Sequence, residues 1–223
     1  MLYLYHKEAG ASTLTLTGEE HRYLFKVRRH KANEKLHLRN LEDGYLYTYE
    51  VASIDKRSVV LSLLSKTLHE VKPTRSLHIG WCVIDPKSIE KVLPSLNEIG
   101  VEKVTFIYCQ RSQKSFKLDF KRLHKILINS SQQSGRTEMM ALEIADNIDS
   151  FLEKHPKSYM LNFSQTSLDT VRENIETLII GCEGGFTDEE RALFEEHKIV
   201  GFSTPLVLKS ESAACAVAAK ILL

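Results

Sequence analysis

The chain has 223 residues, of which 43% are hydrophobic and 26% charged, and its formal net charge is +1. This composition is typical of an ordinary globular protein, and the length suits two modest domains. No apolar run approaches the ~20 residues of a membrane span, and the N-terminus, MLYLYHKEAG, lacks the apolar core of a signal peptide. We therefore expect a cytoplasmic protein with no membrane partner.

The first seventy or so residues are predicted to form short strands. Alternating or β-branched and aromatic residues mark the segments 2–6, 12–18, 35–40, 45–55 and 58–66. A helix is expected over residues 19–29, and Asn33 is expected in a turn because asparagine tolerates positive φ. Strands this short and this closely spaced indicate a small barrel or sandwich. The polar, proline-containing stretch 68–76 is the expected linker.

The pattern changes after the linker. A strand is predicted over residues 77–84, followed by a helix with Asp85 as N-cap, Pro86 at its first position and Gly100 just past its end. Pro94 should kink or interrupt this helix. Further strands are predicted at 104–109, 158–164, 177–183 and 198–203, and further helices at 120–134, from 187 onward, and at 210–223. Alternating strands and helices indicate a mostly parallel α/β sheet.

The four cysteines, Cys82, Cys109, Cys182 and Cys215, lie far apart in the sequence. No two of them form a C-x-x-C pair, and no histidine stands at ligand spacing from any of them. The sequence therefore predicts neither a metal site nor a disulfide framework.

Two segments concentrate positive charge although the net charge is small. Residues 21–39 carry seven lysines and arginines against the single acid Glu34, and residues 111–136 carry seven against Asp119. A near-neutral chain with two basic clusters holds its compensating acid elsewhere, which is how a binding face for an anionic partner arises. The alternative is that both clusters are ordinary solvated faces.

A glycine-rich turn, GCEGGF at residues 181–186, follows the predicted strand at 178–180. Thr187 and Glu190 then form a capping-box pattern that begins a helix. In an α/β sheet, ligands bind at the carboxyl ends of strands. The turn lacks the spacing of a dinucleotide or phosphate loop, and Glu183 would repel phosphate. It therefore predicts a neutral or cationic ligand with an apolar part, unless the glycines only make a tight turn.

The segment GCEGGFTDEE resembles the G-P-E-G-G-F-S motif of the bacterial ribosomal RNA uridine N3-methyltransferases, a SPOUT-class family that modifies small-subunit (16S) rRNA. Four more segments match in register. EIGVEKVTFIYCQRS resembles E-L-G-V…E-R-S, SSQQSGR resembles E-Q-S-G-R, LVLKSESAACAVAA resembles I-L-R-T-E-T-A-A, and HRYLFKVRRHKANEKL resembles H-x-L-x-R-V-L-R-x-K-x-G-D. The resemblance spans nearly the whole chain.

The resemblance implies a fold and an activity. Residues 1–70 would form a PUA-like, RNA-binding β-barrel, and residues 71–223 a SPOUT-type α/β methyltransferase domain with a C-terminal trefoil knot. The protein would be a homodimer that binds S-adenosyl-L-methionine in the knot. It would methylate N3 of a specific uridine in 16S rRNA, either free or in the assembled small subunit.

The resemblance also implies a cofactor site between the strand around residues 159–163, the glycine turn and the loop 203–208. Backbone groups would read the adenine, because only a missing Cβ lets main chain approach so closely. The implied cofactor-binding residues are Leu161, Ile180, Gly181, Cys182, Glu183, Gly184, Gly185, Ser203, Thr204, Val207 and Leu208. The aliphatic residues among them could equally be core.

Methylation of uracil N3 requires loss of the ring proton and stabilisation of negative charge on O2 and O4. The matched segments supply the cations Arg111, Arg136 and Lys209. Glu211 and Glu183 are the carboxylates that could accept the proton or orient a donor. Arg111 could instead form a structural ion pair, and Glu211 could instead favour the dipole of the last helix.

The residues expected to bind RNA are Lys26, Arg28, Arg29, Lys31 and Gln133. The four basic residues would contact phosphates, Gln133 would read a base edge, and the target base would be unstacked to present N3.

Some positions depart from the family pattern. Cys182 replaces a proline, Lys209-Ser210-Glu211-Ser212 replaces R-T-E-T, Asn33-Glu34 replaces G-D, and Phe202-Ser203-Thr204 replaces S-L-G. Two other functions therefore stay open at this point. One is a SPOUT enzyme with another target atom, such as a ribose 2′-hydroxyl, and the other is an RNA-binding module without catalysis.

Overall fold

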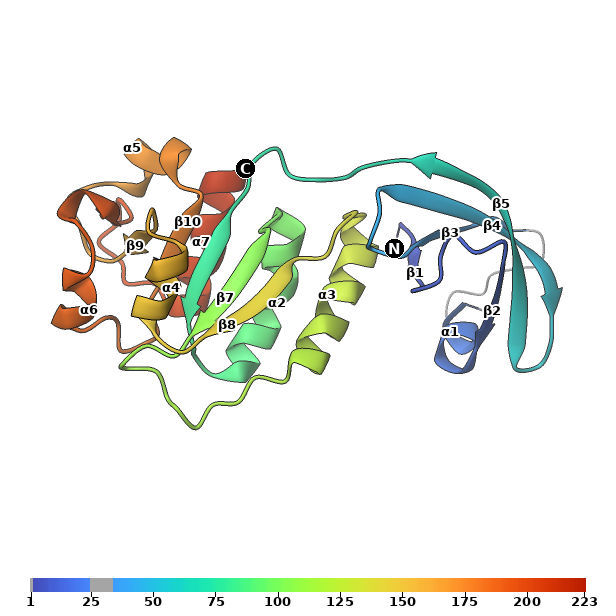
Figure 1. Cartoon of the computed structure of the whole chain (residues 1–223), viewed down its shortest axis with the longest axis horizontal. Coiled ribbons are helices and arrows are strands. Elements are labelled where there is room, and N and C mark those ends of the chain that lie inside the picture. The colour runs from blue at the N-terminus through green and yellow to red at the C-terminus, as the bar shows by residue number, and fades with distance from the viewer. Residues whose placement is uncertain (1, 25–33) are drawn as a thin grey trace. The chain divides into compact units, whose positions relative to one another are not determined.

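A computed structural model describes residues 2–24 and 34–223 (Figure 1). The chain divides into two compact units. The first comprises Met1–Lys72 with Ser131–Met139, and the second comprises Pro73–Ser130 with Met140–Leu223. The segment 131–139 therefore belongs to the first unit, although the sequence on both sides of it belongs to the second.

The first unit contains a five-stranded sheet in the order β1-β3-β4-β5-β2. Its strands are β1 (Leu4–Tyr5), β2 (Thr13–Thr17), β3 (Leu36–Arg39), β4 (Tyr45–Ile54) and β5 (Ser58–Leu68). β1 pairs with β3 in parallel, and all other neighbours are antiparallel. Strict alternation in β2 turns Leu14 and Leu16 into a core that also holds Leu38, Tyr49 and Leu61. The predicted strands are confirmed.

A short helix, α1 (Gly18–Arg22), follows β2. The helix that the sequence predicts over 19–29 begins here, but residues 25–29 lie outside the described part of the chain. The expected turn at Asn33 lies outside it as well.

The second unit contains a six-stranded, wholly parallel sheet in the order β11-β9-β10-β6-β7-β8. Its strands are β6 (His78–Cys82), β7 (Lys103–Ile107), β8 (Ala141–Ala145), β9 (Tyr159–Leu161), β10 (Thr177–Ile180) and β11 (Ile199–Val200). The mostly parallel α/β sheet is confirmed. The edge strand β8 is not predicted by the sequence. It is more exposed than the central strands and has no continuous apolar run, which is the pattern that marks a buried strand.

The helices of the second unit alternate with these strands. They are α2 (Pro86–Ile99), α3 (Phe120–Ser134), α4 (Ile148–Lys154), α5 (Leu168–Val171), α6 (Asp188–Ala192) and α7 (Ser210–Leu222), with 3₁₀ turns η2 (Arg172–Asn174) and η3 (Glu196–Lys198). α3 continues into the first unit through its last four residues. Among the helices of the described residues, none has the length and apolar character needed to cross a membrane.

The two faces of the parallel sheet carry different helices (Figure 1). His78 packs its ring against Phe151 of α4, and a Cβ on Gly80 would meet the same phenylalanine. Trp81 is the next residue along β6, so its side chain points to the opposite face of the sheet. There its indole donates a hydrogen bond to the Ser210 hydroxyl at the start of α7 (2.9 Å). α4 and α7 therefore cover opposite faces of the sheet.

α2 forms as its sequence predicts. The Asp85 side chain accepts a hydrogen bond from the Lys87 amide, and Gly100 ends the helix in the left-handed conformation (φ 113°). The helix is continuous at Pro94, so it is not interrupted there, and the kink stays a prediction. The adjacent Leu93 is fully buried, and core packing of this kind holds a helix together across a proline.

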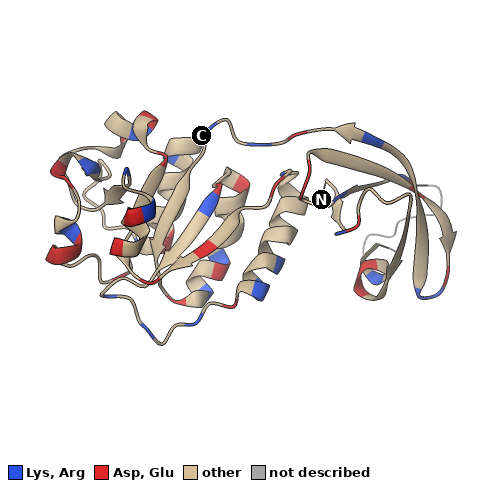
Figure 2. Cartoon of the chain, in the orientation of Figure 1, with Lys and Arg blue, Asp and Glu red and all other residues tan. Residues whose placement is uncertain are grey.

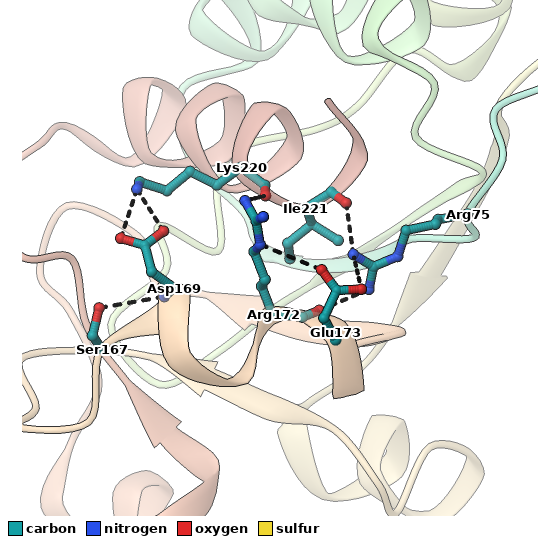
Figure 3. Close-up of polar contacts among 7 residues, drawn as sticks. All are labelled: Arg75, Ser167, Asp169, Arg172, Glu173, Lys220 and Ile221. Atoms are coloured by element: carbon teal, nitrogen blue, oxygen red, sulfur yellow. Dashed lines mark hydrogen bonds and ion pairs between the residues drawn. The ribbon is translucent and has the colours of Figure 1, made fainter.

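The last helix is fastened at its carboxyl end, where the final carbonyl groups have no partner within the helix. Figure 3 shows Arg75 donating to the Ile221 carbonyl (3.0 Å) and to the Arg172 carbonyl (2.8 Å). Lys220 on α7 pairs with Asp169 of α5 (2.6 Å). These contacts tie α7 to the segment 168–174 and to the segment before β6.

Candidate functional site

A cavity of about 740 Å³ opens at the carboxyl ends of β9 and β10 in the second unit. Its walls come from the chain after β9, the glycine turn after β10, the segment 201–209 and the first turn of α7. Predicted cofactor-binding residues line it as follows: Leu161, Ile180, Gly181, Cys182, Glu183, Gly185, Thr204, Val207 and Leu208. The structure thus gathers residues from three separate segments around one space.

Two of the predicted cofactor-binding residues do not line this cavity. Gly184 turns away from it, because a Cβ on Gly184 would lie 3.2 Å from the Cβ of Arg111. Ser203 is exposed, and its hydroxyl is 2.8 Å from that of Ser167. The absence of a side chain at Gly184 therefore makes room for Arg111 in this structure.

The glycine turn has a defined backbone conformation. The Gly185 amide donates to the Cys182 carbonyl (2.9 Å), which closes the turn. Gly185 has a φ of 68°, in the region that side chains with a Cβ rarely occupy. The Gly181 carbonyl accepts a hydrogen bond from the Ser210 hydroxyl (2.5 Å), so the turn is joined to the start of α7.

A buried carboxylate connects the glycine turn region to the segment after β7. Glu190 of α6 is 4% exposed. One carboxylate oxygen accepts from the Gln110 amide (2.7 Å) and the other from the Thr187 amide (2.9 Å). The capping box predicted from Thr187 and Glu190 is confirmed, since Thr187 also accepts from the Glu190 amide (3.2 Å). The bond to Gln110 is additional and was not predicted.

Arg111 follows Gln110 and is exposed. Its guanidinium donates to the Gly184 carbonyl (2.7 Å), so the arginine lies directly against the glycine turn. The structure therefore brings one of the predicted catalytic cations to the turn through a main-chain hydrogen bond.

The other two predicted catalytic residues in the second unit lie at the start of α7. Lys209 is exposed, lines the cavity and occupies the N-cap position of the helix. Glu211 lies in the first turn of α7, is partly buried, and does not line the cavity. Lys209 is thus the predicted cation with direct access to the space.

Arg136 and Gln133 lie in the first unit. Arg136 is buried; its Nε donates to the Glu138 carbonyl (2.7 Å), and its own carbonyl accepts from the Tyr3 hydroxyl (2.7 Å). Burial raises the pKa of Tyr3, against the effect of the nearby Arg39 and Arg136. Gln133 is exposed. The predicted RNA-binding residues Lys26, Arg28, Arg29 and Lys31 lie outside the described residues.

The second basic cluster forms an exposed surface on the loop between β7 and α3 and on the first turns of α3 (Figure 2). Its exposed members in the second unit are Arg111, Lys114, Lys117, Lys121, Arg122 and Lys125. Within this set, Arg122 pairs with Glu90 of α2 (2.7 Å). The surface is available to an anionic partner.

A second cavity, of about 770 Å³, lies at the carboxyl ends of β7 and β8. Lys114 and Lys117 contribute to its lining, together with Cys109 and the carboxylates Asp146, Asp149 and Glu190. Among the described residues, no group of histidines, cysteines and carboxylates is arranged to hold a metal ion.

Sequence reasoning missed part of the first cavity's lining. Phe163 and Leu206 line it and are strongly exposed, at 76% and 72%. Arg191 of α6 also contributes. A large apolar residue two positions after the short strand β9 was the available signal for Phe163, whereas Arg191 lies in a polar helix that gives no such signal.

The comparisons with known proteins agree with this geometry. Residues 70–222 match the RNA methyltransferase domain family, and residues 16–64 match the RNA methyltransferase PUA domain family. The ribosomal RNA small subunit methyltransferase E of Helicobacter pylori (strain ATCC 700392 / 26695) is 41% identical over 221 residues, covering 98% of each chain. Its Aquifex aeolicus counterpart is 21% identical and covers 95% of each.

Solved structures resemble the whole fold. A methyltransferase from Legionella pneumophila, solved in complex with the cofactor SAM, has a TM-score of 0.80 at 25% identity and covers 98% of this chain and 95% of its own. A ribosomal RNA small subunit methyltransferase E from Neisseria gonorrhoeae has a TM-score of 0.82 at 20% identity, with the same coverage. The chain therefore belongs to the ribosomal RNA small subunit methyltransferase E family, and it combines a PUA domain with a SPOUT-type α/β methyltransferase domain.

Proposed function

We propose that this protein uses S-adenosyl-L-methionine to methylate N3 of a specific uridine in small-subunit (16S) ribosomal RNA. The observation that carries the proposal is the cavity at the ends of β9 and β10, whose wall is the glycine turn that matches the family motif. Membership of the family and the name of its 41% identical relative support the same substrate.

The cavity suits this cofactor chemically. Its volume of about 740 Å³ lies in the range of small-molecule sites, roughly 300–1,000 Å³. Leu161, Ile180, Val207 and Leu208 offer apolar walls for an adenine ring, and the turn offers main-chain donors and acceptors. The Glu183 carboxylate on the rim favours a cation. When bound, the cofactor supplies an activated methyl group.

The chain's own residues prepare the uridine. Lys209 would place positive charge beside a uracil oxygen, and Arg111 would do the same from the far side of the turn. Glu211 would accept the N3 proton or orient the group that does, with Glu183 as the second candidate. Arg136 belongs to the same matched set as a cation for the substrate.

The remaining expectations are proposed with this function. Residues 1–70 would bind RNA, residues 71–223 would carry catalysis and a C-terminal trefoil knot, and two copies would form a homodimer in the cytoplasm. Lys26, Arg28, Arg29 and Lys31 would contact phosphates, and Gln133 would contact a base edge. Gly184 would affect cofactor binding by making room for Arg111. Ser203 would affect it by positioning the loop that contains Thr204.

The test of the reaction is mass spectrometry of 16S rRNA from cells that lack the protein. We expect the loss of one N3-methyluridine and its return when the wild-type gene is supplied. A Lys209→Met variant should restore it poorly. An unchanged set of modifications, or the loss of a ribose 2′-O-methyl group instead, would refute the proposal.

Calorimetry with the purified protein separates an enzyme from an inert RNA-binding module. The enzyme should bind S-adenosyl-L-methionine with a single site per chain. Absence of binding at millimolar cofactor would instead support a module without catalysis.

A further inference from the structure

Three thiols converge behind the first cavity. Cys82 ends β6, Cys109 follows β7 and Cys182 follows β10, and these strands are neighbours in the order β10-β6-β7. All three cysteines are buried and free. The sulfur atoms of Cys109 and Cys182, 73 residues apart in the sequence, lie 3.8 Å from each other.

Each cysteine of this pair lines a different cavity of the second unit. Cys182 contributes to the lining of the cavity at β9 and β10, and Cys109 contributes to the lining of the cavity at β7 and β8. Each thiol is buried beneath the surface, but each borders a space that a small solute can enter. A small oxidant can therefore reach the pair without unfolding the protein.

We propose that Cys109 and Cys182 are an oxidisable dithiol, and that the disulfide between them lowers the affinity of the proposed cofactor site for S-adenosyl-L-methionine. The part of this inference that concerns the cofactor rests on the proposed function. The formation of the disulfide does not. Such reversible disulfides are the kind that reducing compartments admit.

The geometry requires only a short approach. A disulfide has an S–S length of about 2.05 Å, so the two sulfur atoms must come closer by roughly 1.8 Å. Both cysteines lie outside the strands, Cys109 in the segment after β7 and Cys182 in the glycine turn. Side-chain rotation and a small shift of these two connections can supply the approach without moving the sheet.

The local polar groups also suit the reaction. The hydroxyl of Ser112 is 3.1 Å from the Cys109 sulfur. Hydrogen bonding with Cys182 and Cys82 lowers the pKa of Cys109, and hydrogen bonding with Cys109 together with burial raises the pKa of Cys182. We assign the first attack to Cys109, because the Ser112 hydroxyl beside its sulfur can donate to the thiolate, which is the reactive form.

With a peroxide as oxidant, the reaction is balanced. The Cys109 thiolate attacks one oxygen of hydrogen peroxide, the O–O bond breaks, and the second oxygen leaves as water after taking up a proton. The Cys182 sulfur then attacks the Cys109 sulfenic acid, the S–S bond forms, and the hydroxyl leaves as a second water with the Cys182 proton. Two thiols lose two electrons and two protons, and one peroxide becomes two waters.

The disulfide would change the shape of the turn that lines the cavity. The Cys182 carbonyl accepts the hydrogen bond from Gly185 that closes this turn, and the next carbonyl but one, at Gly184, accepts from Arg111. Drawing Cys182 toward Cys109 displaces both contacts. We expect the affinity for S-adenosyl-L-methionine to fall at least tenfold.

The experiment treats the full-length protein with hydrogen peroxide and maps its thiols by alkylation and peptide mass spectrometry. Two of the four thiols should be lost, in a peptide pair that joins Cys109 to Cys182, and dithiothreitol should restore both. Cys109→Ser should form no such link, whereas Cys215→Ser, which removes a half-buried thiol on α7, should still form it. An absent link, or a link from Cys82, would overturn the assignment.

Calorimetry on the same samples tests the effect on the cofactor. Wild type and Cys215→Ser should lose at least tenfold in affinity on oxidation and regain it with dithiothreitol, and Cys109→Ser should not respond to the oxidant. A disulfide that forms without changing affinity would refute the coupling. If the reduced wild-type protein binds no cofactor, the proposed function fails, while the thiol map still decides whether the pair is oxidisable.

Discussion

At the scale of single residues, Glu190 connects more of the site than its place in a helix cap requires. Its carboxylate accepts main-chain hydrogen bonds from both Gln110 and Thr187, and it is almost completely buried. Since Arg111 is the next residue after Gln110, the position of this proposed catalytic cation depends on Glu190. A buried carboxylate with two donors is costly to replace.

We expect Glu190→Gln to destabilise the protein by about 1–3 kcal/mol, because one of the two amide donors then faces an NH₂ group. It should also lower kcat more than it raises KM for the RNA, because Arg111 loses its position. Urea unfolding and steady-state kinetics measure the two effects. Glu153→Gln on α4, with an exposed side chain, is the matched control and should leave both unchanged.

Gly185 is the second residue with a specific role. Its φ of 68° is the left-handed conformation, which costs a residue with a Cβ roughly 1–2 kcal/mol. No atom lies within 4 Å of the position that a Cβ would take, so the cost of substitution is in the backbone and not in a collision.

Gly185→Ala should therefore weaken binding of S-adenosyl-L-methionine by about tenfold, because the turn relaxes away from the conformation that lines the cavity. Gly18→Ala provides the control: Gly18 has a φ of 55° and open space around it, but it lies in the first unit. Calorimetry should show unchanged cofactor affinity for the control. Equal losses in both variants would contradict a local role for Gly185.

At the scale of elements, the sequence predicts much of this fold because the signals are local. The caps of α2 at Asp85 and Gly100 and the bounds of α3 follow from residue types alone. β8 and α4 escape prediction, since an edge strand with Ile144 exposed has no buried run and a seven-residue helix spans barely two turns.

The site divides in the same way. The glycine turn and its helix cap are contiguous in the sequence, and their conformation is predictable from it. The contacts between Glu190 and Gln110 and between Cys109 and Cys182 are not predictable in this way. They arise because β7 and β10 flank β6 in the sheet. This strand order follows from tertiary packing, so the sequences after β7 and after β10 contain no local signal for the contacts.

The carboxyl end of α7 gives a prediction at this scale. Arg75→Ala removes the hydrogen bonds to the Ile221 and Arg172 carbonyls and should destabilise the protein by about 1–2 kcal/mol. Urea unfolding measures the change. Arg122→Ala, which breaks an ion pair of a more exposed arginine with Glu90, should cost less than about 1 kcal/mol. A larger loss for Arg122→Ala would contradict this ranking.

At the scale of the whole molecule, the net charge is close to zero, yet basic residues are concentrated on the loop between β7 and α3 and on α3. Phosphate contacts make nucleic-acid affinity depend on salt, with a slope that counts the contacts. A protein of net charge +1 can therefore bind RNA tightly only through such a concentrated region.

Replacing both Lys114 and Lys117 by alanine should weaken binding of a 16S rRNA fragment and reduce the slope of log affinity against log salt by about 1.4–1.8, for two lost phosphate contacts. Fluorescence anisotropy at several salt concentrations measures the slope. Lys154→Ala with Lys157→Ala removes the same charge from exposed positions at the end of α4 and just after it, and should leave the slope nearly unchanged. Parallel losses in the two double variants would indicate a general charge effect instead.

The hydroxyl of Ser210 links the glycine turn to the interior of the sheet. It donates to the Gly181 carbonyl and accepts from the indole of Trp81, and Trp81 is the protein's sole tryptophan. A ligand that shifts the glycine turn on binding therefore alters the hydrogen bond of that indole. The intrinsic fluorescence of the unlabelled protein should therefore report when its cavity fills.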